Sequence, residues 1–259
     1  MLTSYFKTFD DKLLKKSKKK AAAKKTSGKT SGKTAKKKAS AKSAVVSSKL
    51  DLKQIIEALN NIIPSSLSLD AGKPIDSGGF APEGVDLCIY KKYCNSIIDI
   101  MDGYVPYELL YGLVYLVEKL DKKELADTLS KVAAAKKLNR FVMGEEETTD
   151  EEPEESIPVP SFIIVNDSQG SLMDVKNDVI NYYMAKSVNH EYEFDIMMVI
   201  NKGLIVKNWR EKRSYIAFET EDDTMMWFFI LMNEYLDMER DNAIDFRKYI
   251  KKDIAYPQY

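Results

Sequence analysis

Asp86 is the third residue of the stretch GVDLCIYKKY, and it begins an apolar run that is typical of a buried strand. A carboxylate presented by a strand is a hard oxygen ligand of the kind that Mg²⁺ prefers. Mg²⁺-assisted phosphodiester hydrolysis also needs a second acid on the next strand and a lysine two residues beyond that acid. The spacing of two is required because side chains on a strand alternate between its faces.

The strands and helices that position such a site must pack around a hydrophobic core, and the chain has enough apolar residues to form one. It has 259 residues, of which 44% are hydrophobic. Two cysteines, Cys88 and Cys94, are too few for a disulfide framework, and no segment resembles a signal peptide or a membrane span. We therefore expect a soluble protein without membrane contact that is cytoplasmic or nucleoid-associated, and a viral origin stays open.

Charge divides the chain into unlike parts. Fourteen lysines and no acid lie between Lys12 and Lys42, which leaves about −15 on the remainder for a net charge of −1. The segment 15–48 has too little apolar surface to offset its ordering entropy, so we expect it to be disordered. An acidic run from Glu145 to Glu155 predicts a disordered loop at 144–156, and residues 1–14 have the spacing of a short amphipathic helix.

The remaining residues, 49–259, predict one mixed α/β domain, because helical and strand patterns alternate along them. Helical periodicity predicts helices at 52–63, 121–138, 171–186, 222–240 and 242–253. Apolar runs predict strands at 85–90, 161–165, 193–200, 203–208 and 213–220, and a short strand and glycine-rich turn are expected within 66–79. The stretch 107–120 is ambiguous between strand and helix. Asp121 is expected to cap the helix that follows it.

This order of elements resembles the PD-(D/E)XK, or restriction-endonuclease-like, nuclease superfamily. More closely, residues Leu50 to Tyr249 are similar to a mostly prokaryotic family of that superfamily whose role is not established. The matching positions are Gly72, Asp76, Gly78, Asp86, Tyr90, Pro106 and Glu108. The resemblance implies a mixed sheet flanked by helices, with Asp86 at the acidic position of the first site strand.

The resemblance also implies that the site is degenerate. Aligned through Pro106 and Glu108, the acid and the lysine of the family motif fall on Tyr115 and Val117. Glu118 and Lys119 lie nearby, but adjacent residues on a strand point to opposite faces. We therefore expect no catalytic residues, a relic position at Asp86, and no cofactor. The alternative is an active, Mg²⁺-dependent nuclease of a defence type, in which Asp86 is joined by migrated ligands, with Glu57, Glu83 and Glu108 as the candidates.

The lysine-rich segment is expected to bind DNA or RNA without sequence preference, because each lysine that neutralises a phosphate releases a counterion. The lysines assigned to this contact are Lys15, Lys16, Lys18, Lys19, Lys20, Lys24, Lys25, Lys29, Lys33, Lys36, Lys37, Lys38 and Lys42. A solubilising linker, a partner for the chain's own acidic run, and a scaffold that binds acidic proteins are the other interpretations. No aromatic residue is interleaved with the lysines, which argues against base stacking by this segment itself. A homo-oligomer stays open.

Three further features have ordinary structural interpretations. His190 is the only histidine, and an ordinary surface residue is expected there. Cys88 is expected in the core, and no zinc site is expected because a second cysteine pair is missing. The sequence NWREKR at 208–213 predicts a solvated hairpin turn, with contact to a backbone phosphate as the alternative.

Overall fold

The computed structural model describes residues 52–138 and 158–236. The expected helix at 1–14, the lysine-rich segment 15–48, the acidic loop 144–156 and the expected helix at 242–253 lie outside the described residues. Within them, the α-helices are α2 (Leu52–Asn60), α3 (Asn95–Ile100), α4 (Lys122–Ala135), α5 (Leu172–Lys186) and α6 (Thr224–Leu236). Short 3₁₀ helices are η1 (Lys92–Cys94), η2 (Tyr107–Leu109), η3 (His190–Tyr192) and η4 (Glu221–Asp223).

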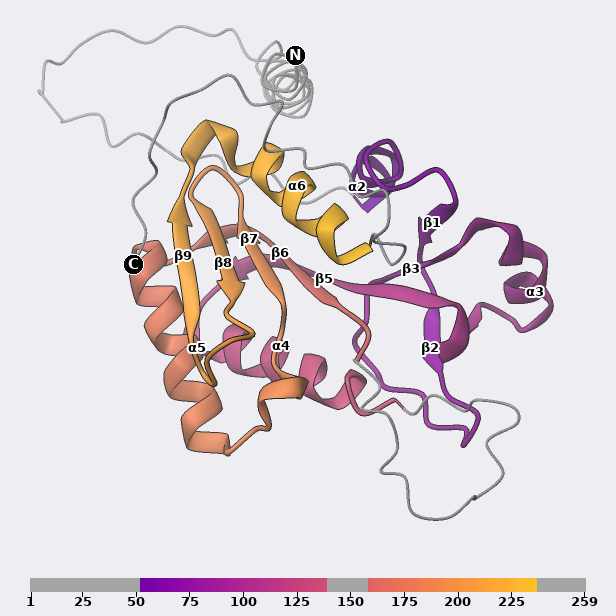
Figure 1. Cartoon of the computed structure of the whole chain (residues 1–259), viewed down its shortest axis with the longest axis horizontal. Helices are drawn as coiled ribbons and strands as arrows, with labels where there is room; N and C mark the ends of the chain where they lie inside the picture. Colours follow the sequence, from indigo (N-terminus) through magenta and orange to yellow (C-terminus); the bar gives the residue numbers. More distant parts are fainter. Residues whose placement is uncertain (1–51, 139–157, 237–259) are drawn as a thin grey trace, which may run out of the picture.

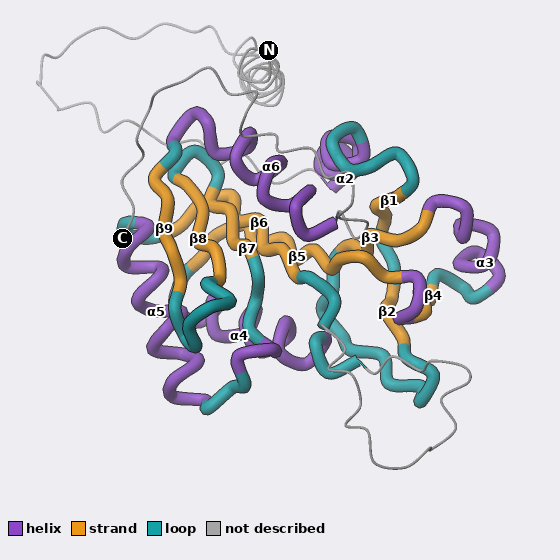
Figure 2. Tube along the Cα trace, viewed as in Figure 1, coloured by secondary structure: helices purple, strands orange, loops and turns teal. Residues whose placement is uncertain are grey.

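A seven-stranded mixed sheet crosses the molecule in the order β1-β3-β5-β6-β7-β8-β9 (Figure 2). Its strands are β1 (Leu67–Asp70), β3 (Leu87–Lys91), β5 (Leu110–Leu120), β6 (Ser161–Ser168), β7 (Ile196–Val199), β8 (Gly203–Lys207) and β9 (Tyr215–Glu219). The pairs β5–β6 and β6–β7 are parallel, and the other pairs are antiparallel. The parallel pairs need crossover connections, which α4 and α5 provide.

The ambiguous stretch 107–120 is mainly a strand, β5, which lies between β3 and β6 in the sheet. Its side chains alternate between two cores: Tyr115 and Val117 face one, while Val114 and Leu116 face the other. A strand that is covered on both faces is apolar almost throughout. Such a strand has no polar alternation to distinguish it from a buried helix, and for this reason the sequence pattern was ambiguous.

Helices cover both faces of the sheet, so the molecule has three layers (Figure 1). One core contains the apolar residues of α4 and α5, and the other contains those of α2 and α6. The N-terminus of α4 is capped as expected, because the Asp121 side chain accepts hydrogen bonds from the N–H groups of Lys123 and Glu124. The expected mixed sheet flanked by helices is confirmed.

The sequence did not predict a second, two-stranded sheet and the short helix α3. Strands β2 (Lys73–Ile75) and β4 (Tyr104–Pro106) pair in parallel, and each contains a proline and only three residues. Segments this short carry too little periodicity to be recognised. No helix among residues 52–138 and 158–236 is long and apolar enough to cross a membrane.

Candidate active site and its surroundings

Asp86 directly precedes β3, and two hydrogen bonds attach it to β5. Its backbone N–H donates to the Val114 carbonyl at 3.2 Å, and its carboxylate Oδ2 accepts from the Leu116 N–H at 2.7 Å. Because Leu87 pairs with Val114, Asp86 lies opposite Tyr115. The sheet therefore places Asp86 beside the position to which the resemblance assigns the second acid.

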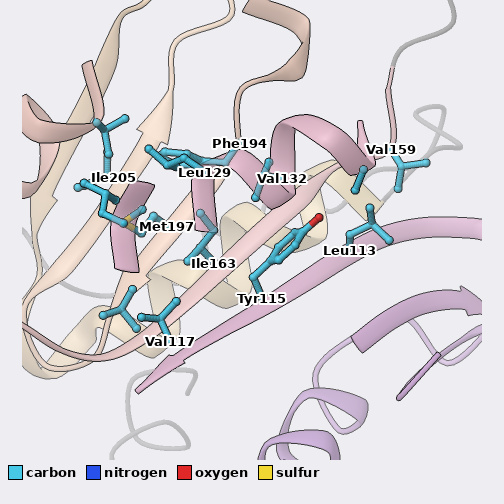
Figure 3. Close-up of a cluster of buried hydrophobic side chains, with 14 of the residues drawn as sticks. Leu113, Tyr115, Val117, Leu129, Val132, Val159, Ile163, Phe194, Met197 and Ile205 are labelled. Atoms are coloured by element: carbon cyan, nitrogen blue, oxygen red, sulfur yellow. The ribbon is translucent and has the colours of Figure 1, made fainter. Parts of the chain in front are cut away.

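Tyr115 and Val117 lie in the core, where their side chains are 1% and 2% exposed. Figure 3 shows Tyr115 near Val132 of α4, and Val117 belongs to the same apolar cluster. The Tyr115 hydroxyl is buried and has no hydrogen-bond partner among the described residues. Burial raises the pKa of Tyr115, so its hydroxyl stays protonated and is not an anionic metal ligand.

Glu118 and Lys119, the nearest charged pair along β5, do not replace the motif. Glu118 follows the same alternation as Leu116, so it lies on the sheet face opposite Tyr115. Its carboxylate Oε1 accepts a hydrogen bond of 3.1 Å from the Asn166 side chain of β6. Lys119 is exposed near the end of the strand. The two charges are therefore separated by the sheet, as adjacent residues on a strand must be.

Lys131, a residue of α4 that sequence reasoning missed, approaches Asp86. Lys131 forms an ion pair of 2.5 Å with Asp127, one helical turn earlier. The aliphatic stem of Lys131 crosses Gly84, where a Cβ atom would lie 2.6 Å from the lysine Cδ. Burial raises the pKa of Asp86, while the bond from Leu116 and the charge of Lys131 act in the opposite direction. The spacing of Asp127 and Lys131 is visible in the sequence, but the approach of Lys131 to Asp86 depends on the crossover from β5 to α4.

The structure places the three candidate migrated ligands differently. Glu57 is exposed on α2, whose apolar residues belong to the α6 side of the sheet, whereas Cys88 and Tyr115 belong to the α4 side. Glu108 lies in η2, before β5 begins, whereas Asp86 lies opposite Tyr115 at the middle of β5, roughly 16 Å from Leu110 at about 3.3 Å per residue. Glu83 is exposed in the loop before β3. Of the three, only Glu83 is near Asp86 in the chain.

A second group of charged residues, also missed by sequence reasoning, is buried beside the C-terminal end of α4. Lys136 and Asp195 form an ion pair of 2.5 Å with side chains 0% and 1% exposed. Glu193 accepts hydrogen bonds from Tyr215 at 2.8 Å and from His190 at 2.9 Å, if the His190 Nδ1 carries the proton. The expectation that His190 is an ordinary surface residue is wrong, since its side chain is only 15% exposed. Cys88 is buried as expected, and Cys94 is buried as well.

A mixed sheet with antiparallel β3–β5, parallel β5–β6 and an aspartate directly before β3 is the arrangement expected of a restriction-endonuclease-like fold. Solved structures of NucC share this fold. NucC of E. coli MS115-1 in its apo form has a TM-score of 0.58 and 16% identity, with 76% of this chain and 87% of that chain covered. The cAAA-bound forms of NucC from P. aeruginosa ATCC27853 and from E. coli MS115-1 give TM-scores of 0.54 and 0.56, both at 16% identity, with 76% of this chain and 82% and 81% of theirs covered. No protein-family model and no curated protein matches the sequence.

The expectation of no cofactor is wrong, because the NucC proteins that share this fold are metal-dependent nucleases. Among residues 52–138 and 158–236, however, no three His, Cys, Asp or Glu side chains are placed to hold one metal ion. Asp86 supplies one carboxylate, and one of its oxygens already accepts the Leu116 hydrogen bond. The described residues therefore do not form a complete ligand set for Mg²⁺ at this position.

Proposed function

We propose that this chain is a nuclease-fold protein that binds nucleic acid without sequence preference and does not cleave it at the β3–β5 site. The observation that carries the proposal is the burial of Tyr115 and Val117 under α4, at 1% and 2% exposure. Activating water for phosphodiester cleavage requires hard anionic ligands and a cation beside the scissile phosphate. A protonated phenol and an isopropyl group in a dry core supply neither.

The lysine-rich segment supports binding without base readout. Lysines in a segment free of acids contact phosphates as point charges, and this contact carries no sequence information. Fourteen lysines between Lys12 and Lys42 exceed the number needed for tight binding at low salt. Each contact to duplex DNA adds about 0.9 to the slope of log K against log salt, so binding is expected to weaken steeply with salt.

The test measures binding and cleavage on the same samples of full-length protein. A fluorescent 30-base-pair duplex is titrated at about 50, 100 and 200 mM salt, with Mg²⁺ or Mn²⁺ present, and each sample is then run on a denaturing gel. The comparison is a full-length variant in which the fourteen lysines from Lys12 to Lys42 are replaced by glutamine. We expect intact DNA, and a salt slope that falls by several units in the variant. Unchanged binding by the variant would exclude the lysine-rich segment as the contact.

A metal-dependent nuclease with a rearranged site is the second candidate, and one observation favours it. Lys131 brings an ammonium from α4 toward Asp86, and its ion-pair partner Asp127 places a carboxylate beside that ammonium; these are the group types that the motif on β5 has lost. Metal-dependent cleavage that is abolished separately by Asp86→Asn and by Asp127→Asn would establish this candidate and overturn the first one. Glu57→Gln is the matched control, because Glu57 is an exposed acid on α2.

A further inference from the structure

The turn that joins β8 to β9 carries an exposed tryptophan beside three exposed cations. Residues 208–214 form this turn, which is closed by a hydrogen bond of 2.9 Å from the Asn208 N–H to the Ser214 carbonyl. Trp209 is 43% exposed, although it is one of only two tryptophans in the chain. The cations that follow it, all exposed, are Arg210, Lys212 and Arg213. The exposed acid within the turn is Glu211, so the turn has a net positive charge.

Trp209 is exposed but held in one orientation. Its indole Nε1–H donates to the Tyr235 hydroxyl of α6 at 3.1 Å. The ammonium of Lys207 lies 3.6 Å from the indole ring centroid, and the His190 ring contacts it edge-on with centroids 5.7 Å apart. An aromatic side chain that is already fixed loses little conformational entropy when a ligand packs against it. Rigid, exposed aromatic residues of this kind are effective binding anchors.

The two acids buried beneath Trp209, Asp195 and Glu193, both have partners. Asp195 is paired with Lys136, and Glu193 is hydrogen-bonded by Tyr215 and His190. Burial, with a smaller effect of the neighbouring Lys136, lowers the pKa of Lys207 to about 8, while Asp195, Glu193 and Glu191 act in the opposite direction. Glu191, beside His190, is the exposed acid of η3. The surface around Trp209 is therefore aromatic and predominantly basic.

We propose that Trp209 and the adjacent basic turn bind single-stranded nucleic acid, with a base stacked on the indole ring and the phosphates of the neighbouring nucleotides on Arg210, Lys212 and Arg213. Every base has a π-face, so stacking of this kind tolerates any sequence. Bases within a duplex are already stacked on each other and cannot pack on Trp209. The inference rests on the proposed function in one respect: it adds a second contact, selective for unpaired bases, to the lysine-rich segment that binds any phosphate backbone.

Tryptophan fluorescence tests the contact directly in the full-length chain. In a Trp227→Phe variant, Trp209 is the only remaining tryptophan. Titration with a 15-residue oligo-dT, with oligo-U of the same length and with a duplex separates an unpaired base from phosphate alone, and DNA from RNA. We expect both single strands to quench the emission and the duplex to leave it unchanged. Equal quenching by duplex and single strands would overturn the stacking contact.

Matched variants separate the turn from the lysine-rich segment. A triple variant, Arg210→Gln, Lys212→Gln and Arg213→Gln, removes three exposed charges from the turn, and the control removes three exposed charges elsewhere with Lys92→Gln, Lys119→Gln and Lys123→Gln. We expect the turn variant to weaken oligo-dT binding roughly ten-fold and to lower its salt slope by about 2, because each single-strand phosphate contact adds about 0.7. Equal losses in both triple variants would show that only net charge matters.

Stacking is tested on Trp209 itself by binding of a labelled oligo-dT. Trp209→Leu is expected to weaken binding about ten-fold or more, and Trp209→Phe is expected to retain most of it, because phenylalanine still offers a ring. Similar losses in both variants would contradict stacking. The variant in which the fourteen lysines from Lys12 to Lys42 are replaced by glutamine distinguishes the two proposals: if it binds oligo-dT but not duplex, both hold. If it keeps full duplex binding, the proposal that the lysine-rich segment binds nucleic acid is overturned. The fluorescence result then still decides whether Trp209 stacks on a base.

Discussion

The carboxylate of Asp86 accepts a hydrogen bond of 2.7 Å from the backbone N–H of Leu116. This contact lies where β3 diverges from β5, so that the Leu116 N–H has no strand partner on that side and the side chain of Asp86 takes its place. The aspartate at the acidic position of the fold therefore has a structural task that needs no metal. An aspartate retained for this reason is compatible with a sheet that no longer performs catalysis.

Two replacements of Asp86 separate the contribution of its hydrogen bond to Leu116 from the contribution of its negative charge. We expect Asp86→Ala to lower the free energy of unfolding by about 0.5–1.5 kcal/mol, because the Leu116 N–H loses its protein acceptor at an exposed position. Asp86→Asn keeps an acceptor oxygen and removes the charge, so it is expected to cost less than half as much. Urea denaturation of the three proteins at pH 7 checks this. Equal losses in both variants would show that the charge, and not the hydrogen bond, is the stabilising feature.

The buried hydroxyl of Tyr115 has no partner among the described residues, so removing it is expected to stabilise the protein. Tyr115→Phe should raise the free energy of unfolding by about 1 kcal/mol, since an unsatisfied buried polar group carries a desolvation cost. Tyr215→Phe is the matched control, because its hydroxyl donates to Glu193 at 2.8 Å, and we expect that variant to be destabilised by a similar amount. A loss of stability in Tyr115→Phe would mean that the hydroxyl does have a partner.

The ion pair between Lys136 and Asp195 is expected to be one of the most sensitive contacts in the fold. Lys136→Met leaves Asp195 buried and unpaired, which typically costs about 3–5 kcal/mol. Adding Asp195→Asn should recover part of this loss, because a neutral amide needs no counter-ion. Lys137→Met, at the neighbouring exposed lysine, should change stability by no more than about 0.5 kcal/mol. Additive effects in the double variant would contradict a direct pairing.

Stability should depend on pH through Lys207. Its folded-state pKa is lowered from 10.5 to about 8, mainly by burial, and Lys136 adds to the effect while Asp195, Glu193 and Glu191 oppose it. Between these two values the unfolded chain binds more protons than the folded one, so this group's contribution to stability rises with pH from 8 to 10.5 and is lost as pH falls through 8. The measurement is the difference in unfolding free energy between the wild type and Lys207→Met at pH 7, 8, 9 and 10. A difference that stays constant over this range would refute the lowered pKa.

Local sequence patterns were sufficient for most elements of the fold. The helix predicted at 171–186 and the strand predicted at 161–165 correspond to α5 and to part of β6, because amphipathic periodicity and apolar runs with clear ends are local properties. The strand β5 was not distinguishable from a helix, since both of its faces are covered. The sequence also supplied the residue types at the site: Asp86 is present, and Tyr115 and Val117 stand where an acid and a lysine would be.

The sequence by itself determined the charge separation, the order of elements and the residue types of the candidate site. Only the tertiary structure decided that Lys131 approaches Asp86, that Lys136 and Asp195 are paired, and that Trp209 is held on the surface by Lys207 and Tyr235. Asp195 follows Lys136 by 59 positions, and no local pattern relates them. Contacts of this kind depend on the crossovers that place α4 and α5 on one face of the parallel strands β5, β6 and β7, and on the burial that makes each charge require a partner.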